Sequence, residues 1–112
     1  MKILGIDPGS TRIGYGLIES NGALKPLKFG LIEIHQRTIV EKLRELIPRI
    51  NALLNELKPT LVAIEKLYFA KNQKTAIEVS EARGTIIGCV VQHNIAIAEY
   101  TPKEVKLSLT ND

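Results

Sequence analysis

Two acidic residues end apolar segments that have the pattern of β-strands. Asp7 ends KILGID, and Glu65 ends TLVAIE. An unpaired buried carboxylate costs several kcal/mol, so each needs a compensating group. If the two strands are parallel neighbours, about 4.8 Å apart, alternation places Asp7 and Glu65 side by side on one face, at the carboxyl ends of the strands. Adjacent carboxylates repel unless a cation holds them, and a hard divalent ion such as Mg²⁺ suits oxygen ligands.

Each acid also has an ordinary interpretation, as a helix N-cap or as half of a surface ion pair. The occurrence of two such acids, both at strand ends, favours the metal interpretation for the pair.

The stretch that follows the first acid, DPGSTRIGYG, combines small residues with hydrogen-bond donors. Ser10 and Thr11 offer hydroxyl and amide donors to an anion, and Arg12 adds a positive charge. Glycines allow close approach of a backbone or a phosphate, and this stretch has Gly9, Gly14 and Gly16. A tight hairpin without any ligand would use the same residue types. The pattern is neither a Walker loop nor a dinucleotide fingerprint.

The first half of the chain predicts three strands and a helix. Strands are expected over 2–7, 13–19 and 27–34, with a hairpin at Asn21-Gly22, which together form an antiparallel meander. A helix follows Thr38, a suitable N-cap, with an apolar face that includes Val40 and Ile47 and a polar face that includes Lys42. Pro48 predicts a kink or two shorter helices, and Pro59 ends the helical pattern.

The second half alternates strands with helices. The sequence predicts strands over 60–65 and 94–100, a helix over 73–92, and a last helix that opens at Thr101-Pro102 and continues through 103–109. The order β-β-β-α-β-α-β-α predicts an α/β fold, with a five-stranded mixed sheet flanked by helices. A length of 112 residues fits a single domain, 1–112.

Composition excludes several classes of protein. Aromatic residues make up 4% of the chain, so aliphatic side chains must fill the core. The single cysteine, Cys89, is expected to be buried and fits a reducing, cytoplasmic location. No apolar run reaches the roughly 18 residues of a membrane span. A net charge of +3 is compatible with a polyanionic partner without arguing for one.

Three blocks of the sequence resemble one family in order. ILGIDPGSTRIGYGLI, AIEKLYFAKNQKTAIEVSEARG and YTPKEVK are similar to the opening, second and third blocks of the RuvC family of Holliday junction resolvases. The resemblance implies an RNase H-like fold and a homodimeric endonuclease that uses two Mg²⁺ ions, with Mn²⁺ as a substitute. It also implies symmetric nicking of four-way DNA junctions in recombination and repair, together with branch-migration proteins.

The resemblance also assigns residues. Asp7 and Glu65 fall on metal-binding, catalytic carboxylates of the family, and Tyr68 falls on an aromatic residue that could stack on a base. The neighbouring Phe69 could serve instead. The expected DNA contacts are Ser10, Thr11, Arg12, Tyr68, Lys71, Asn72, Lys103 and Lys106. The segment EARGTIIGC matches the family's dimerising helix, with Arg83, Gly84, Ile87 and Gly88 at the interface. Packing of that helix on the sheet of its own monomer is the alternative interpretation, and several of the lysines fit a solvated surface equally well.

The sequence departs from the family in one respect. Family members carry two further acids in an Asp-x-x-Asp arrangement, which nothing here matches. We therefore expect a C-terminally truncated or diverged domain that is weakly active or inactive alone, with one sheet face partly uncovered. Three other functions remain open: a non-catalytic junction-binding or dimerising module, a phosphate-binding fragment like those of actin-like ATPases and sugar kinases, and a related RNase H-like nuclease of ribosomal-RNA processing.

Overall fold

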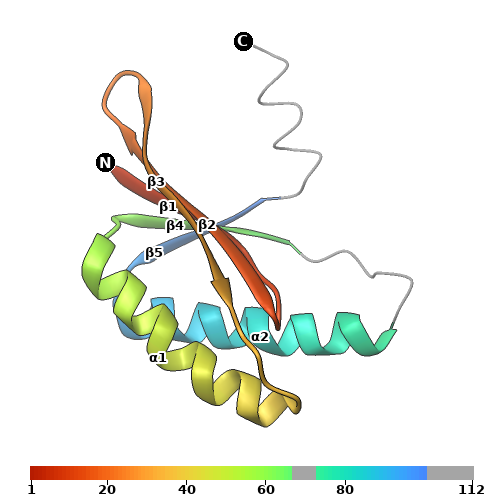
Figure 1. Ribbon diagram of the computed structural model, residues 1–112. Helices are drawn as coiled ribbons and strands as arrows, with labels where there is room; N and C mark the ends of the chain where they lie inside the picture. The colour runs from red at the N-terminus through yellow and green to blue at the C-terminus, as the bar shows by residue number, and fades with distance from the viewer. Residues whose placement is uncertain (67–72, 101–112) are drawn as a thin grey trace.

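A computed structural model describes residues 1–66 and 73–100, which form a five-stranded sheet and two helices (Figure 1). The strands are β1 (Lys2–Asp7), β2 (Arg12–Ser20), β3 (Leu24–Glu33), β4 (Leu61–Glu65) and β5 (Ala96–Tyr100), and the helices are α1 (Ile39–Leu57) and α2 (Gln73–Gln92). The spatial order is β3-β2-β1-β4-β5, with antiparallel pairing from β3 to β1 and parallel pairing from β1 to β5. The predicted mixed sheet is confirmed.

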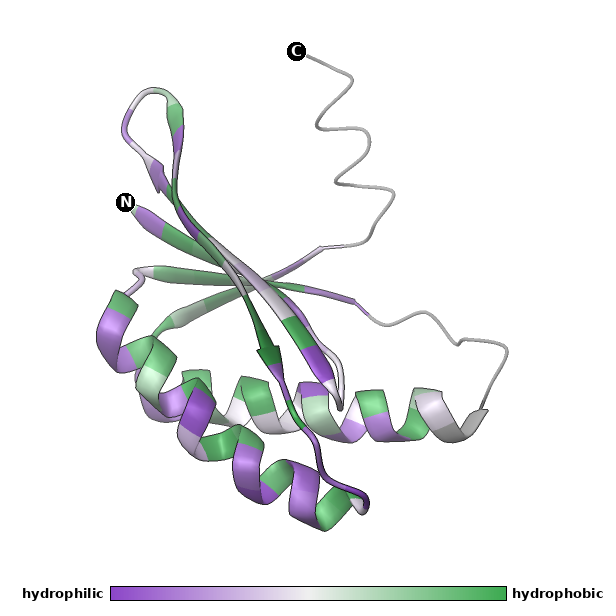
Figure 2. Ribbon diagram, viewed as in Figure 1, coloured by the Kyte–Doolittle hydropathy of each residue, from purple (hydrophilic) through white to green (hydrophobic). Residues whose placement is uncertain are grey.

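Helices α1 and α2 lie on the same face of the sheet and bury one side of it (Figure 1). Hydrophobic and hydrophilic residues alternate along both helices (Figure 2), and the buried apolar ones belong to one core cluster with the strands. The core between the two layers is aliphatic, as the composition requires. Its largest fully buried side chains are Leu4, Ile6, Ile13, Leu46, Ile50, Leu54, Val62, Ile64, Ile86 and Val90.

The opposite face of the sheet carries the alternate residues of each strand. Ile3, Gly5 and Asp7 of β1 lie on this face, because Leu4 and Ile6 point into the core. The cross-strand register adds Phe29, which is 68% exposed. Among residues 1–66 and 73–100, no helix lies over this face (Figure 1). We call it the open face.

Helix α1 begins at a capping box and ends at a left-handed residue. The Thr38 hydroxyl accepts a hydrogen bond from the Glu41 amide, and the Glu41 carboxylate accepts one from the Thr38 amide. Lys58, with φ 46°, caps the other end immediately before Pro59. The prediction of two shorter helices is wrong, because α1 runs unbroken through Pro48. Pro48 and Arg44 are both exposed, so water can satisfy the carbonyl that the proline leaves without a donor.

The polar and apolar faces of α1 differ from those that its spacing predicts. Lys42, predicted on the polar face, is buried, and its ammonium pairs with Glu78 of α2 at 3.2 Å. Val40 and Ile47, predicted on the apolar face, are 57% and 41% exposed. The cause is tertiary, because α1 packs against α2 as well as against the sheet, and the second contact moves the buried stripe.

The predicted hairpin between β2 and β3 is confirmed, although its turn is longer than a two-residue one. Ser20 pairs with Leu24, so three residues form the connection, and only Gly22 has positive φ, 86°. Strand β3 begins three residues before the predicted start, and β5 begins at Ala96, after the left-handed Asn94. The predicted helix over 101–109 lies outside the described residues.

The buried Lys42–Glu78 pair generates a stability prediction. Lys42→Met leaves Glu78 without its partner, and we expect the free energy of unfolding to fall by about 2–3 kcal/mol. Lys42→Met with Glu78→Met should recover much of that loss. Urea denaturation measures both variants. The control is Lys28→Met, which breaks the exposed Lys28–Glu56 pair and should cost at most about 0.5 kcal/mol. Equal losses for the two single variants would contradict the prediction.

Candidate active site

The carboxyl ends of β1 and β4 bring Asp7 and Glu65 together. The two strands are parallel neighbours in the register Ile3–Leu61 and Gly5–Ala63, which continues to Asp7 beside Glu65. Both side chains therefore lie on the open face. Burial raises the pKa of the Glu65 carboxyl, as do the negative charge of Asp7 and a hydrogen bond with its side chain. The geometry predicted from the two strand ends is confirmed.

A tyrosine completes this edge of the site, and the sequence analysis missed it. Tyr100 is the last residue of β5 and pairs with Glu65 across β4 and β5, so it shares the open face with both acids. Burial raises the pKa of the Tyr100 hydroxyl, and the charges of Glu65 and Asp7 raise it further. The sequence could have indicated Tyr100, because this residue ends β5 just as Asp7 and Glu65 end the other two parallel strands, β1 and β4.

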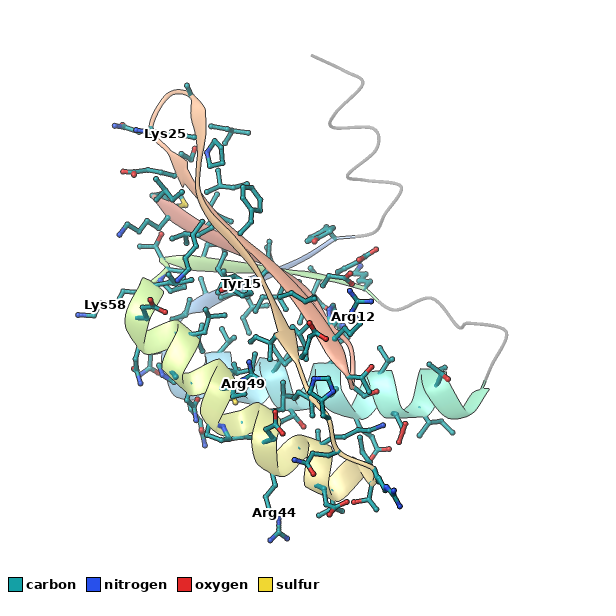
Figure 3. All side chains as sticks on the ribbon, in the orientation of Figure 1. Arg12, Tyr15, Lys25, Arg44, Arg49 and Lys58 are labelled. Carbon is teal, nitrogen blue, oxygen red and sulfur yellow. The ribbon has the colours of Figure 1, made fainter. Side chains whose placement is uncertain are left out.

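The turn between β1 and β2 follows directly from Asp7 and is tightly built. A Cβ on Gly9 would lie 2.3 Å from the Arg12 carbonyl oxygen, so glycine is needed there. The Thr11 carbonyl accepts a hydrogen bond from the Ile34 amide, which anchors the turn to the end of β3. Thr11 and Arg12 are exposed, and Arg12 begins β2 directly after the turn (Figure 3), whereas Ser10 is 8% exposed.

A shallow groove of about 260 Å³ runs across the open face beside Asp7. Glycines form much of its lining, namely Gly5, Gly14 and Gly16, and Ile18, Phe29 and Tyr100 complete it. Tyr15 also borders the groove, although its side chain packs against the core. The Phe29 ring lies over Gly16, because a Cβ built there would meet it at 2.7 Å. A Cβ added to Gly14 would lie 3.8 Å from the Cβ of Asp7. Glycine therefore keeps the surface next to the carboxylate free of side chains.

The donor chemistry of this edge fits a hard divalent cation. Asp7 and Glu65 offer adjacent carboxylate oxygens, the preferred ligands of Mg²⁺, and a cation between them would relieve their mutual repulsion, which adds to the effect of burial on the Glu65 pKa. In the part of the chain that the structure describes, no three or more His, Cys, Asp or Glu side chains are grouped so that they could hold a metal ion together. The two acids would thus hold a cation from one side and leave its other positions to water or to substrate oxygens.

The remaining predicted site residues divide into two groups. Tyr68, Lys71, Asn72, Lys103 and Lys106 lie outside the described residues. The four residues expected at a dimer interface are on α2. Gly84 and Gly88 are exposed, and a Cβ on either would meet no atom within 4 Å. Ile87 packs partly on the core. Arg83 makes contacts within the chain, described below.

Comparison with known proteins decides the family. The model of the family "Crossover junction endodeoxyribonuclease RuvC" matches residues 3–112, nearly the whole chain. The chain belongs to the RuvC family. The predicted family is therefore confirmed.

Individual RuvC proteins agree with this assignment. RuvC of Brachyspira hyodysenteriae is 46% identical over all of this chain and 71% of its own length, and RuvC of Caldicellulosiruptor saccharolyticus is 45% identical over 98% and 68%. Both carry the name crossover junction endodeoxyribonuclease. The structure titled "T. thermophilus RuvC in complex with Holliday junction substrate" superposes with a TM-score of 0.87 at 28% identity, over 97% of this chain and 71% of the other. This likeness confirms the RNase H-like fold.

The raised pKa of Glu65 predicts a pH dependence of stability. The folded chain holds the Glu65 proton more tightly than the unfolded chain does. The resulting stabilisation is present below the ordinary pKa of 4.5 and is lost as pH rises through the raised pKa. Without metal, Glu65→Gln should therefore unfold at a higher temperature than wild type at pH 7, and at nearly the same temperature at pH 3.5. Calorimetric scans at both pH values measure this. A Gln variant less stable than wild type at pH 7 would contradict the raised pKa of Glu65.

Proposed function

We propose that this chain is the metal-binding part of a nuclease that nicks four-way DNA junctions, with Asp7 and Glu65 as catalytic residues. The observation that carries the proposal is the adjacency of these two carboxylates on an open, glycine-lined face. Membership of the RuvC family supports the reaction class. Two Mg²⁺ ions, or Mn²⁺ as a substitute, would neutralise phosphate charge, activate the attacking water and stabilise the leaving oxygen.

In this proposal the residues of the chain orient and hold the substrate. The carboxylate oxygens of Asp7 and Glu65 would hold the cations, and the rest of the chain would position the DNA. Thr11 and Arg12, exposed on the neighbouring turn, contact phosphates and position the DNA without reading its sequence. Tyr100, protonated at neutral pH, offers a hydroxyl donor beside the acids. Ser10, largely buried, would reach DNA only through its backbone. Contacts from Tyr68, Lys71, Asn72, Lys103 and Lys106 remain predictions.

The setting of this activity is proposed on the same basis. Within the described residues, neither helix is both long and apolar enough to cross a membrane. We propose a cytoplasmic enzyme of recombination and repair that works with branch-migration proteins, and a single RNase H-like domain over 1–112.

A labelled synthetic four-way junction tests the proposed reaction. We expect binding that favours the junction over linear duplex, and slow paired nicks that require Mg²⁺ and stop with EDTA. The nicks should be slow because two carboxylates neutralise only part of the charge of two cations. Asp7→Asn should lower the nicking rate by about 100-fold or more, since a metal contact contributes several kcal/mol. Lys28→Met, remote from the site, is the control.

Three outcomes would contradict the proposal. Nicking that survives EDTA or Asp7→Asn would show that the reaction does not depend on a metal site at Asp7. Junction binding without nicks by the wild-type chain would support a non-catalytic junction-binding module. Absence of any preference for the junction over linear duplex would show that the four-way junction is not the specific substrate.

A homodimer is proposed from the outer side of α2. Ile77 and Val91 are 60% and 58% exposed, and with Gly84 and Gly88 they follow one another at helical spacing. They form a stripe of apolar and small residues on a helix whose other side already packs in the core. A second copy paired along this stripe would present two active sites to the two strands of a symmetric junction.

A charge in this stripe should disrupt the dimer. Val91→Arg buries an unpaired charge at the interface, and we expect the dissociation constant to rise at least about 30-fold, equivalent to about 2 kcal/mol. Sedimentation equilibrium measures it. The matched control is Val40→Arg, at a residue of similar exposure on α1, outside the stripe. Equal effects of the two variants, or a wild-type chain that is monomeric at high concentration, would contradict the proposed dimer.

A further inference from the structure

Arg83 connects the middle of α2 to the strand end that carries Glu65. Its Nε donates a hydrogen bond to the Glu65 carbonyl oxygen at 3.0 Å. Its Nη2 pairs with the carboxylate of Glu99 on β5. One planar guanidinium therefore holds the ends of two adjacent strands from the helix side of the sheet, with two donors in fixed relative positions.

A second hydrogen bond fixes the backbone at Glu65, in addition to the one from Arg83. The Lys66 amide, directly after the end of β4, donates a hydrogen bond to the Tyr100 carbonyl oxygen at 2.7 Å. The carbonyl and the next amide of Glu65 both have partners, although the residue is at the end of its strand. Its carboxylate lies on the open face, opposite the guanidinium, so Arg83 acts on the backbone and leaves the carboxylate to a ligand.

The Arg83–Glu99 pair differs from an ordinary surface ion pair. The Arg83 side chain is 15% exposed, against 45% for Glu99, so the cation is largely removed from water. The exposed pair Lys28–Glu56 has 43% and 62% exposure and makes no contact with the site. The hydrogen bond and charge of Arg83 lower the pKa of Glu99, which keeps the pair ionised well below neutral pH.

We propose that Arg83 is a positioning residue for the metal site, which fixes the backbone of Glu65 and thereby directs its carboxylate toward Asp7. This inference rests on the proposed function, because it takes Glu65 as a metal ligand. Arg83 is also one of the residues predicted at the dimer interface. The contacts within the chain occupy two of its donors, and the positioning role requires no partner subunit.

The test is the affinity of the chain for Mn²⁺, measured from the free Mn²⁺ signal in electron paramagnetic resonance. Substitution of a residue that orients a metal ligand typically weakens metal binding by about 10–100-fold, and we expect a loss in that range for Arg83→Met. Arg83→Lys keeps the charge but has one nitrogen for two separated acceptors, so it should recover only part of the loss. Glu99→Gln keeps an acceptor for Nη2 and should have the smallest effect.

The matched control is Lys42→Met, which breaks the other partly buried ion pair of α2 with Glu78. It should lower stability and leave Mn²⁺ affinity within about twofold of wild type, because Lys42 pairs with Glu78 and not with the end of β4. Circular dichroism establishes that each variant is folded at the temperature of the titration. If Arg83→Met does not fold, Arg83→Lys and Glu99→Gln carry the test, with graded losses expected.

The experiment distinguishes failure of the positioning role of Arg83 from failure of the proposed metal site. If wild type binds Mn²⁺, Asp7→Asn loses it, and Arg83→Met and Arg83→Lys bind as wild type does, the positioning role is wrong while the metal site stands. If Lys42→Met weakens binding as much as Arg83→Met, the effect is general destabilisation and the inference is overturned. If wild type does not bind Mn²⁺ at all, the inference fails together with the proposed metal site.

Discussion

Two like charges lie side by side where β1 and β4 end, and the chemistry of the chain depends on how that repulsion is relieved. The parallel register that pairs Gly5 with Ala63 leaves Asp7 and Glu65 no separation along the strands. Burial of the Glu65 carboxyl raises its pKa, and the repulsion from Asp7 raises it further. A divalent cation would relieve that repulsion at neutral pH. The arrangement therefore stores an unfavourable interaction that a ligand can release, as is common at functional sites.

The rest of the structure keeps that contact in place. The aliphatic core fixes β1 and β4 as central strands, with antiparallel neighbours on one side and β5 on the other. Gly9 permits the tight turn after Asp7, and Gly14 leaves the space beside its side chain free. From the helix layer, Arg83 reaches the backbone of Glu65. The helix-covered face of the sheet thus contributes stability, and the open face carries the carboxylates of the site. The ends of β1 and β4 connect the two.

The sequence predicted the elements and the pairing of the two acids because both follow from local rules. Side chains alternate between the two faces of a strand, so Asp7 and Glu65 share one face once β1 and β4 pair as parallel neighbours. The Thr38 capping box is equally local. The features it missed depend on packing between distant segments. Lys42 is buried because α2 supplies Glu78 from 36 residues away. The contacts of Arg83 require α2 to lie under β4 and β5.

Two further differences between the sequence-based predictions and the structure have simple physical causes. Pro48 does not divide α1, because its exposed position lets solvent replace the missing hydrogen bond. Tyr100 joins the site because β5 pairs with β4 in parallel, so that its last residue arrives beside Glu65. The same parity argument that found the acids would have found it, had the pairing of β5 with β4 been included.

Paramagnetic relaxation by substoichiometric Mn²⁺ tests the central claim most directly, with amide signals of the ¹⁵N-labelled chain as the readout. The account predicts that signals of Asp7, Gly14 and Lys66 broaden first, since these residues surround the two carboxylates. Signals on the far side of α1, such as that of Arg44, should stay sharp. Loss of the selective broadening in Asp7→Asn would show that the acids hold the cation. Uniform broadening, or broadening centred on other acids such as Glu45, would contradict the claim that the two strand-end carboxylates form a metal site.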